Sequence, residues 1–304
     1  MDAIAHLLNA LRVSEYSAYS NAQIKTYPDG SAVITVFDRA IIRRPGLELA
    51  RDQEPEEDGP DIPISDTKKA ANLARAKRRA RAAVYDLARA TDFEFFVTLT
   101  INKDKVKDRL DDAEVFRHLQ DWLDNNVRRH GLAYVLVPEY HKAGGLHFHA
   151  FFNSALEVVD SGTISLPWVD KPRRPRSKIQ RAAWLAQGGH VVYNLPGWGW
   201  GYTTAIRLYG DREAAIGYVV KYITKNEKKI GGRWYYSGGP LLRPAVQVED
   251  LDFARASELG DVYEIKELGC KGVKLKIWKE VYDEMLEDLR GTAGHLQRAG
   301  DKEE

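Results

Sequence analysis

Residues 132–153, LAYVLVPEYHKAGGLHFHAFFN, decide the fold. The stretch contains two apolar runs, 132–138 (LAYVLVP) and 146–153 (LHFHAFFN), separated by the turn residues 143–145 (AGG). Two runs rich in branched and aromatic residues, joined by a short loop with glycine, are typical of an antiparallel hairpin. We therefore predict that the two runs are neighbouring strands of one sheet.

The second run carries two histidines in alternate positions, His147 and His149. Alternate side chains of a strand share one face, so both imidazoles project together while Phe148 points to the opposite layer. Two imidazoles and a carboxylate suit a divalent metal. Glu139 is the expected third ligand, and His141 is its competitor. A polar strand face is the alternative for an isolated pair, and a hydrolytic zinc site is disfavoured by the lack of a His-Glu-x-x-His pattern.

A predicted helix over 211–226 (DREAAIGYVVKYITKN) carries tyrosines and lysines at matched spacing. Tyr218 and Tyr222 are four residues apart, as are Lys221 and Lys225, so each pair lies on one helical face. A phenol, with a pKa of about 10, is a weak nucleophile unless a metal or a neighbouring cation supports the phenolate. Phosphoryl transfer to tyrosine therefore favours this pattern, and aromatic core packing with solvated lysines is the alternative.

Two segments are basic. A predicted helix over 65–90 has eight Lys and Arg against two Asp, a local charge of +6, which suits contact with phosphates or a solvated helix face. Residues 160–206 are expected to be irregular, with no acidic residue from 171 to 206 and with several interleaved aromatic residues, a combination that suits single-stranded nucleic acid. The residues expected to contact DNA are Arg75, Lys77, Arg78, Arg79, Arg173, Arg174, Arg176, Trp198 and Trp200.

The composition is that of an ordinary globular protein. The chain has 304 residues, a formal net charge of +1 and 44% hydrophobic residues, and no apolar run is long enough to cross a membrane. One cysteine, Cys270, excludes a disulfide or a cysteine zinc cage within one chain and fits a reducing cytoplasm. Strands at 31–37 and 93–101 and helices at 111–130 and 276–294 complete an α+β pattern of about five strands.

Three motifs occur together and in one order: 96–100 (FVTLT), 147–149 (HFH) and 218–225 (YVVKYITK). In this combination the chain resembles the HUH endonucleases, the replication initiators and relaxases that share an apolar-Thr strand, a His-hydrophobic-His strand and a helix with one or two tyrosines. The doubled Tyr-x-x-Lys unit is most similar to the two-tyrosine rolling-circle initiators of microviruses (the gene A type) and related phage and plasmid Rep proteins. The resemblance covers about residues 66–240.

The resemblance implies a ferredoxin- or RRM-like fold: an antiparallel sheet with helices on one face and the metal site on the other. It divides the chain into an N-terminal extension with an acidic linker (1–64), an endonuclease domain (65–240) and a C-terminal helical extension (241–304). It also assigns roles by position. His147, His149 and Glu139 would bind one Mg²⁺ or Mn²⁺, with Glu139 matching the acidic ligand of viral members. Tyr218 and Tyr222 would be the nucleophiles, Lys221 and Lys225 would handle charge, and Thr98 and Thr100 would be structural or contact DNA.

The implied activity is nicking and joining of single-stranded DNA at a replication origin, through a 5′-phosphotyrosine intermediate that frees a 3′-hydroxyl primer. Because no Walker A pattern occurs, a host helicase and a host DNA polymerase are the expected partners, in the cytoplasm of a bacterial or archaeal cell and without a membrane. A relaxase or single-strand transposase of the same chemistry, a non-catalytic single-stranded nucleic-acid-binding protein and a nuclease that uses water are the alternatives.

Overall fold

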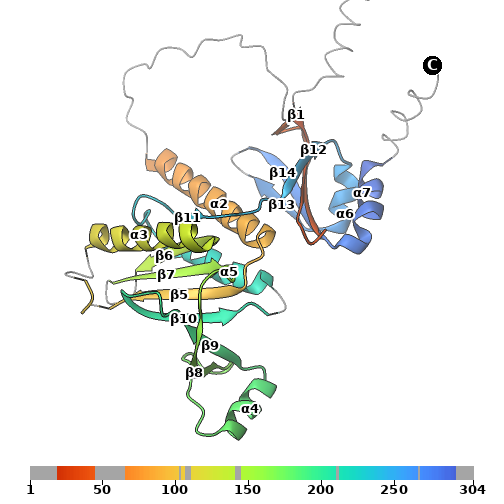
Figure 1. Cartoon of the computed structure of the whole chain (residues 1–304). Helices are drawn as coiled ribbons and strands as arrows, with labels where there is room; N and C mark the ends of the chain where they lie inside the picture. Colours follow the sequence, from red (N-terminus) through yellow and green to blue (C-terminus); the bar gives the residue numbers. More distant parts are fainter. Residues whose placement is uncertain are drawn as a thin grey trace, which may run out of the picture. The chain divides into compact units, whose positions relative to one another are not determined.

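The computed structural model divides the chain into two compact units, one spanning residues 63–243 and the other combining 1–62 with 244–304. Each unit is built on an antiparallel sheet with helices, so the expected α+β class is confirmed (Figure 1). The turn expected at 143–145 and its neighbour His141 fall largely outside the described part of the chain. The structure describes residues 19–44, 66–102, 104–106, 111–140, 145–209, 212–265 and 268–291.

The sheet of unit 63–243 has seven strands in the order β11-β6-β7-β5-β10-β9-β8, and every pairing is antiparallel. The expected hairpin is confirmed, since β6 pairs with β7 along its whole length. The sheet is larger than five strands because 159–207, expected to be irregular, contributes three of them. The strands are β5 (Phe95–Ile101), β6 (Tyr134–Tyr140), β7 (Leu146–Phe152), β8 (Val159–Ser165), β9 (His190–Asn194), β10 (Gly201–Arg207) and β11 (Tyr236–Gly238).

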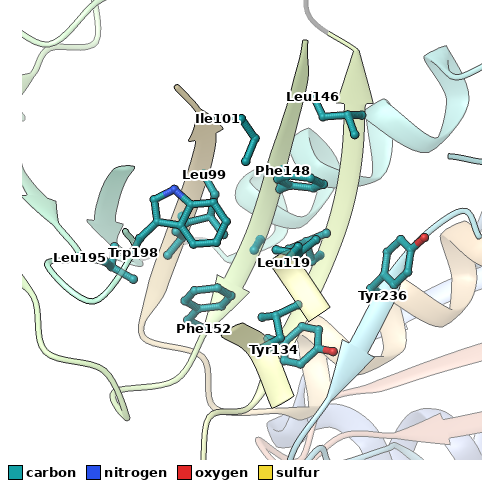
Figure 2. Packing of buried hydrophobic residues seen from close by; sticks show 14 of the residues in the cluster. Leu99, Ile101, Leu119, Tyr134, Leu146, Phe148, Phe152, Leu195, Trp198 and Tyr236 are labelled. Carbon is teal, nitrogen blue, oxygen red and sulfur yellow. The ribbon is translucent and has the colours of Figure 1, made fainter. Parts of the chain in front are cut away.

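Helix α3 (Asp112–His130) covers one face of this sheet. It begins where the Asp111 side chain accepts hydrogen bonds from two backbone amides, and it ends at Gly131, whose φ of 70° is in the left-handed region that glycine adopts without strain. Its apolar stripe packs on Phe148 and the other residues of that strand face (Figure 2). Phe148 lies edge-on to the ring of Phe116 on α3, at a centroid distance of 5.8 Å.

Helices α2 (Asp66–Ala90) and α5 (Arg212–Lys225) cover the opposite face. Val84 of α2 and Val219 of α5 pack in one cluster with Phe151 of β7. Because side chains alternate along β7, His147 and His149 lie on the same face as Phe151. The expectation that the helices leave the histidine face uncovered is therefore wrong. The reason is the apolar stripe of α5, which needs a partner surface.

The flanking segments form the second unit. Its five-stranded sheet, in the order β12-β2-β3-β14-β13, combines strands from both ends of the chain. The C-terminal segment, expected to be helical, therefore contains three strands as well as helices, because alternation in CKGVKLKI favours a half-buried strand. The elements are β2 (Ala22–Thr26), β3 (Ala32–Phe37), β12 (Ala245–Glu249), α6 (Phe253–Leu259), β13 (Val262–Ile265), β14 (Cys270–Ile277), η1 (Lys279–Val281) and α7 (Tyr282–Arg290), with β1 (Tyr19–Ser20) and β4 (Ile42–Arg43) as a separate pair.

Within the described ranges, no helix combines the length and the apolarity that crossing a bilayer requires.

Replacing Leu119 should destabilise unit 63–243 strongly. The side chain is fully buried between α3 and the sheet, so we expect Leu119→Ala to lower the free energy of unfolding by about 2–5 kcal/mol through lost transfer energy and the cavity left behind. Leu73→Ala is the matched control, because Leu73 of α2 is 40% exposed and its loss should cost no more than about 0.5 kcal/mol. Urea unfolding followed by circular dichroism measures both, and equal costs would contradict this packing.

Candidate active site

The register of three strands gathers the predicted site residues on one sheet face. His149 of β7 lies directly opposite Thr98 of β5, and His147 lies opposite Thr100. On the other side of β7, Glu139 of β6 is the partner of His147. Since directly opposed residues of antiparallel strands share a face, these five side chains form two adjacent rows across the middle of the sheet.

His149 is held from both ring nitrogens. Its Nε2 lies 3.0 Å from Oε2 of Glu139, and its Nδ1 lies 3.4 Å from Oγ1 of Thr98. Burial lowers the pKa of His149 below its ordinary value, and the Glu139 carboxylate opposes that shift without cancelling it. The ring is therefore neutral at pH 7, with the orientation of its plane fixed by two neighbouring strands, and a neutral imidazole is the form that binds metals.

Helix α5 brings both tyrosines to this histidine, but into different environments. The ring of Tyr222 stacks on His149 with centroids 3.9 Å apart and planes 7° from parallel. Its hydroxyl donates a hydrogen bond of 2.5 Å to the hydroxyl of Tyr218. Tyr222 is 6% exposed and Tyr218 is 49% exposed. Burial, followed by the hydrogen bond with Tyr218, raises the pKa of Tyr222 above its ordinary value. Tyr218 is thus the phenol that solvent and a substrate can reach.

The two lysines of the motif also differ. Nζ of Lys225 lies 3.6 Å from Oε1 of Glu139 and 4.8 Å from the ring centroid of Tyr222, so it joins the site. Lys221 is exposed on α5 and has no ion pair with any side chain of the described residues. The structure therefore places one cation, Lys225, beside the carboxylate and the buried phenol.

Two further residues belong to the site and were missed by sequence reasoning. Phe96 of β5 lies parallel to the His149 ring at 6.2 Å and edge-on to Tyr218 at 5.6 Å. Asn226, directly after α5, donates a hydrogen bond of 2.8 Å from Nδ2 to the carbonyl oxygen of Pro138, next to Glu139. Alternation along β5 could have identified Phe96, which shares the face of Thr98. No local pattern marks Asn226.

The donor set partly fits a hard divalent ion. Neighbouring ligands of an octahedral ion at about 2.1 Å lie about 3.0 Å apart, which is the distance between His149 Nε2 and Glu139 Oε2. Within the described ranges, however, no three His, Cys, Asp or Glu side chains are gathered as a metal site. Two donors are therefore in place, and His147 would have to turn towards them to complete the set.

Among the residues expected to contact DNA, the two tryptophans have structural positions instead. Trp198 is 4% exposed, packs edge-on against Trp122 at 5.2 Å and points its indole nitrogen at the Thr100 carbonyl. Trp200 stacks on His118 at 3.7 Å. Stacking of Trp198 on a nucleobase would empty part of the core, so the prediction for that ring is wrong. Aromatic residues in a loop-like sequence cannot be distinguished from core residues before the fold is known.

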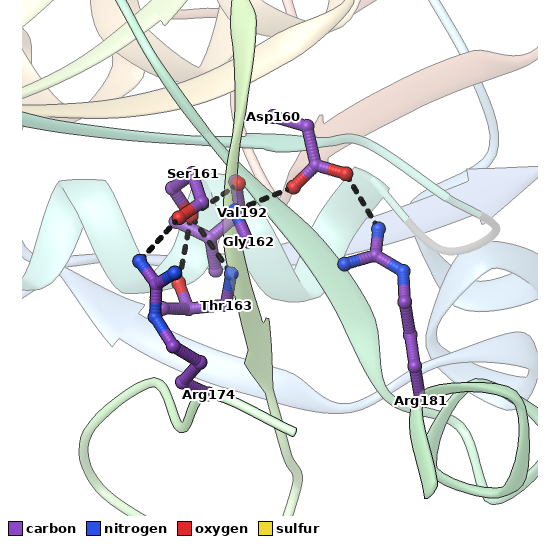
Figure 3. Close-up of polar contacts among 7 residues, drawn as sticks. All are labelled: Asp160, Ser161, Gly162, Thr163, Arg174, Arg181 and Val192. Carbon is purple, nitrogen blue, oxygen red and sulfur yellow. Dashed lines mark hydrogen bonds and ion pairs between the residues drawn. The ribbon is translucent and has the colours of Figure 1, made fainter. Parts of the chain in front are cut away.

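The basic residues of the segment 171–181 divide in a similar way. Nη2 of Arg174 donates to the carbonyl oxygen of Ser161, and its guanidinium lies against Gly162, where a Cβ would approach it to 3.3 Å (Figure 3). Arg181 of α4 (Lys178–Ala186) pairs with Asp160 at 2.6 Å. These two cations fasten the segment to β8. Arg173 and Arg176 are exposed and remain predicted DNA contacts.

On α2, Lys77 is also partly structural, because its Nζ lies 3.3 Å from the Thr224 carbonyl oxygen and 5.4 Å from the Trp234 ring. Arg75, Arg78 and Arg79 are exposed on the same helix. DNA contact by these three arginines stays a prediction.

We expect Asn226→Ala to lower the free energy of unfolding by about 1 kcal/mol, because it removes the hydrogen bond that fastens the end of α5 to β6. Asn125→Ala on the exposed side of α3 is the matched control and should change stability by no more than about 0.5 kcal/mol. Thermal and urea unfolding measure both variants. If the two substitutions had equal effects, the carbonyl contact would not hold the helix in place.

Comparison with known proteins adds a family to this geometry. Neither the search of curated proteins nor the search of solved structures gives a match. Residues 94–227 match the model of a family described as Replication-associated protein ORF2. The matched segment contains β5, β6, β7 and α5, and with them the residues that the strand register and α5 bring together. The chain is therefore similar to a replication-associated protein family over its candidate site, which is consistent with a rolling-circle replication protein.

Proposed function

We propose that the protein initiates rolling-circle replication by nicking and rejoining single-stranded DNA through a tyrosine ester. One observation carries the proposal: the half-exposed hydroxyl of Tyr218 is held by Tyr222 over a sheet face that presents His149 and Glu139. A nucleophile, a neutral imidazole, a carboxylate and the cation of Lys225 meet in one place. The family match over residues 94–227 supports a replication role for this place.

In the proposed reaction, the Tyr218 oxygen forms a bond to the phosphorus of the scissile phosphate while the bond from phosphorus to the 3′ oxygen breaks. The phenolic proton passes to water, which reaches this half-exposed side chain. The 3′ oxygen takes up a proton and leaves as a hydroxyl, which is the primer for a polymerase. Joining is the same exchange in reverse, so the energy of the phosphate ester is conserved and no nucleotide is consumed.

The hydrogen bond between the two phenols assigns them different tasks in the first cleavage. Tyr222 donates to the Tyr218 oxygen, and such a bond stabilises negative charge as Tyr218 loses its proton. Tyr222 itself lies under Tyr218 and against His149, where an in-line approach to a phosphate is blocked. We therefore assign the first attack to Tyr218. Attack by Tyr222 on a regenerated origin requires α5 to move its phenol out of this stack.

His147, His149 and Glu139 would hold one Mg²⁺ or Mn²⁺ in this proposal. When bound, the ion would act as a Lewis acid on a non-bridging oxygen of the phosphate. The residues of the chain prepare that position without it: Thr98 and Glu139 fix the plane of His149, and Lys225 offsets the carboxylate charge. Such partners of a ligand commonly change metal affinity by about 10–100-fold when they are removed.

The tyrosine assignment is tested with covalent adducts. Single-stranded oligonucleotides that the protein retains through denaturation are selected from a random pool in Mn²⁺, labelled at the 3′ end and incubated with variants. Tyr218→Phe should lower the rate of adduct formation by at least about 10³-fold, since the nucleophile is gone. Tyr222→Phe should slow the reaction less and leave the nucleotide on Tyr218 in the digested adduct.

Tyr209→Phe is the matched control, because Tyr209 is exposed and stacks on His190 outside the site. An adduct that persists in the double Phe variant would overturn the proposal. Cleavage without any adduct would identify a nuclease that uses water.

The metal assignment is tested by binding alone. Titration of the whole chain with Mn²⁺, followed by electron paramagnetic resonance, should show one ion per chain. Glu139→Gln, which keeps the shape of the side chain, should weaken binding at least tenfold because it removes the charge of a hard oxygen ligand. His190→Ala on β9 should leave binding unchanged. Equal affinity of Glu139→Gln and the wild-type chain would refute the ligand set.

A further inference from the structure

An exposed tyrosine, Tyr202, stands on the same sheet face as the candidate site. It lies on β10 directly opposite Thr100 of β5, and Thr100 lies opposite His147 of β7. Glu139 of β6 is the next partner in this line. Four adjacent strands therefore carry Tyr202, Thr100, His147 and Glu139 in one row. With strands about 4.8 Å apart, Tyr202 is about 10 Å from the His147 position along the sheet.

The position of Tyr202 is fixed by the strand rather than by its own packing. Gly201 precedes it, and a Cβ at Gly201 would meet the Thr100 carbonyl oxygen at 2.0 Å, so β10 approaches β5 more closely there than any other residue allows. Ala205, on the opposite face of β10, is fully buried. The ring of Tyr202 is 68% exposed. A rigid strand thus presents a large flat ring to solvent beside the site.

The other aromatic residues near Tyr202 have partners that explain them. Trp198 lies in the core, and Trp200 stacks on His118. Of the exposed tyrosines in this unit, Tyr209 stacks on His190, and Tyr218 is the proposed nucleophile. Packing accounts for none of the exposed area of Tyr202, whose ring faces the same way as the site.

We propose that Tyr202 is the platform on which a nucleobase of the scissile strand stacks, no more than about three nucleotides from the phosphate that Tyr218 attacks. This inference rests on the proposed function. The spacing follows from about 10 Å along the sheet and about 3.4 Å per stacked nucleotide, so a more extended strand spans it with fewer. Stacking uses the face of the ring, so all four bases are accepted and the hydroxyl is dispensable. The ring orients the strand for in-line attack and takes no part in the chemistry.

The test compares three variants of the whole chain by fluorescence anisotropy with a labelled single-stranded oligonucleotide of mixed sequence and without metal. Tyr202→Ala should weaken binding by about 5- to 150-fold, the range that corresponds to the loss of one stacked base. Tyr202→Phe keeps the ring and should stay within about twofold of the wild-type chain. Tyr209→Ala removes an equally exposed ring outside the row and should also stay within about twofold.

A second measurement locates the base. Oligonucleotides that carry 5-iodouracil at successive positions from the cleavage point are irradiated with the protein, and the cross-linked peptide is sequenced. Cross-links to Tyr202 from a position within about three nucleotides are expected. Full binding and unchanged cross-links in Tyr202→Ala would overturn the inference. An equal loss in Tyr202→Phe would show a hydrogen bond instead of stacking, and a change in oligomeric state without a change in DNA affinity would identify a protein partner.

The outcome is separable from that of the proposed function. If the Tyr202 variants behave as expected and no covalent adduct forms, the stacking surface stands and the nicking chemistry fails. If the adduct forms and Tyr202→Ala binds and cross-links as the wild-type chain does, the chemistry stands and the stacking surface fails. Circular dichroism of Tyr202→Ala verifies that β10 stays folded.

Discussion

The hydrogen-bonded ladder that joins β6, β7 and β5 is the constraint on which the site depends. It places His149 opposite Thr98 and His147 opposite Glu139, and a slip of one residue would move every one of these side chains to the other face. The slip is prevented by burial, because Phe148 and its neighbours on the far face of β7 would then leave the core beneath α3. The polar site is thus aligned by the apolar residues between its members, and the free energy that folds the sheet also determines where the imidazoles point.

Identical neighbours in a motif become different in the fold. Tyr218 and Tyr222 are separated by one helical turn, about 6 Å along the axis of α5, above a surface that is not uniform. The apolar stripe of α5 presses the helix on the sheet, and Tyr222, flanked by buried residues, stacks on His149, while Tyr218 reaches the open edge beside Phe96. Two equivalent nucleophiles would need the helix to alternate between two positions. A fixed helix makes one phenol the nucleophile and the other its hydrogen-bond donor.

The sequence was informative where one pattern determines one local outcome. Alternation and turn residues predicted the hairpin of β6 and β7, and helical spacing predicted α5, so the motif residues could be assigned to their elements in advance. The burial of Trp198 could not be predicted, because it is set by contacts with Trp122, distant in the sequence. The second sheet could not be predicted for the same reason, since β2 and β3 pair with strands more than 200 residues further along the chain. Asn226 stayed hidden because its role is a single contact with the backbone of another strand.

The polar groups of the site satisfy one another, and this bears on how an ion would enter. A buried histidine is costly unless it is hydrogen-bonded, and here Glu139 and Thr98 supply its partners while Lys225 balances the carboxylate. The distance of 3.0 Å between His149 and Glu139 is at once that of a hydrogen bond and that of adjacent ligands. Exchange of the shared proton for a cation therefore needs no displacement of β6 relative to β7. The movement falls on His147 and on the long, exposed Lys225 side chain, which is why a site can be closed and stable without an ion and still be arranged to accept one.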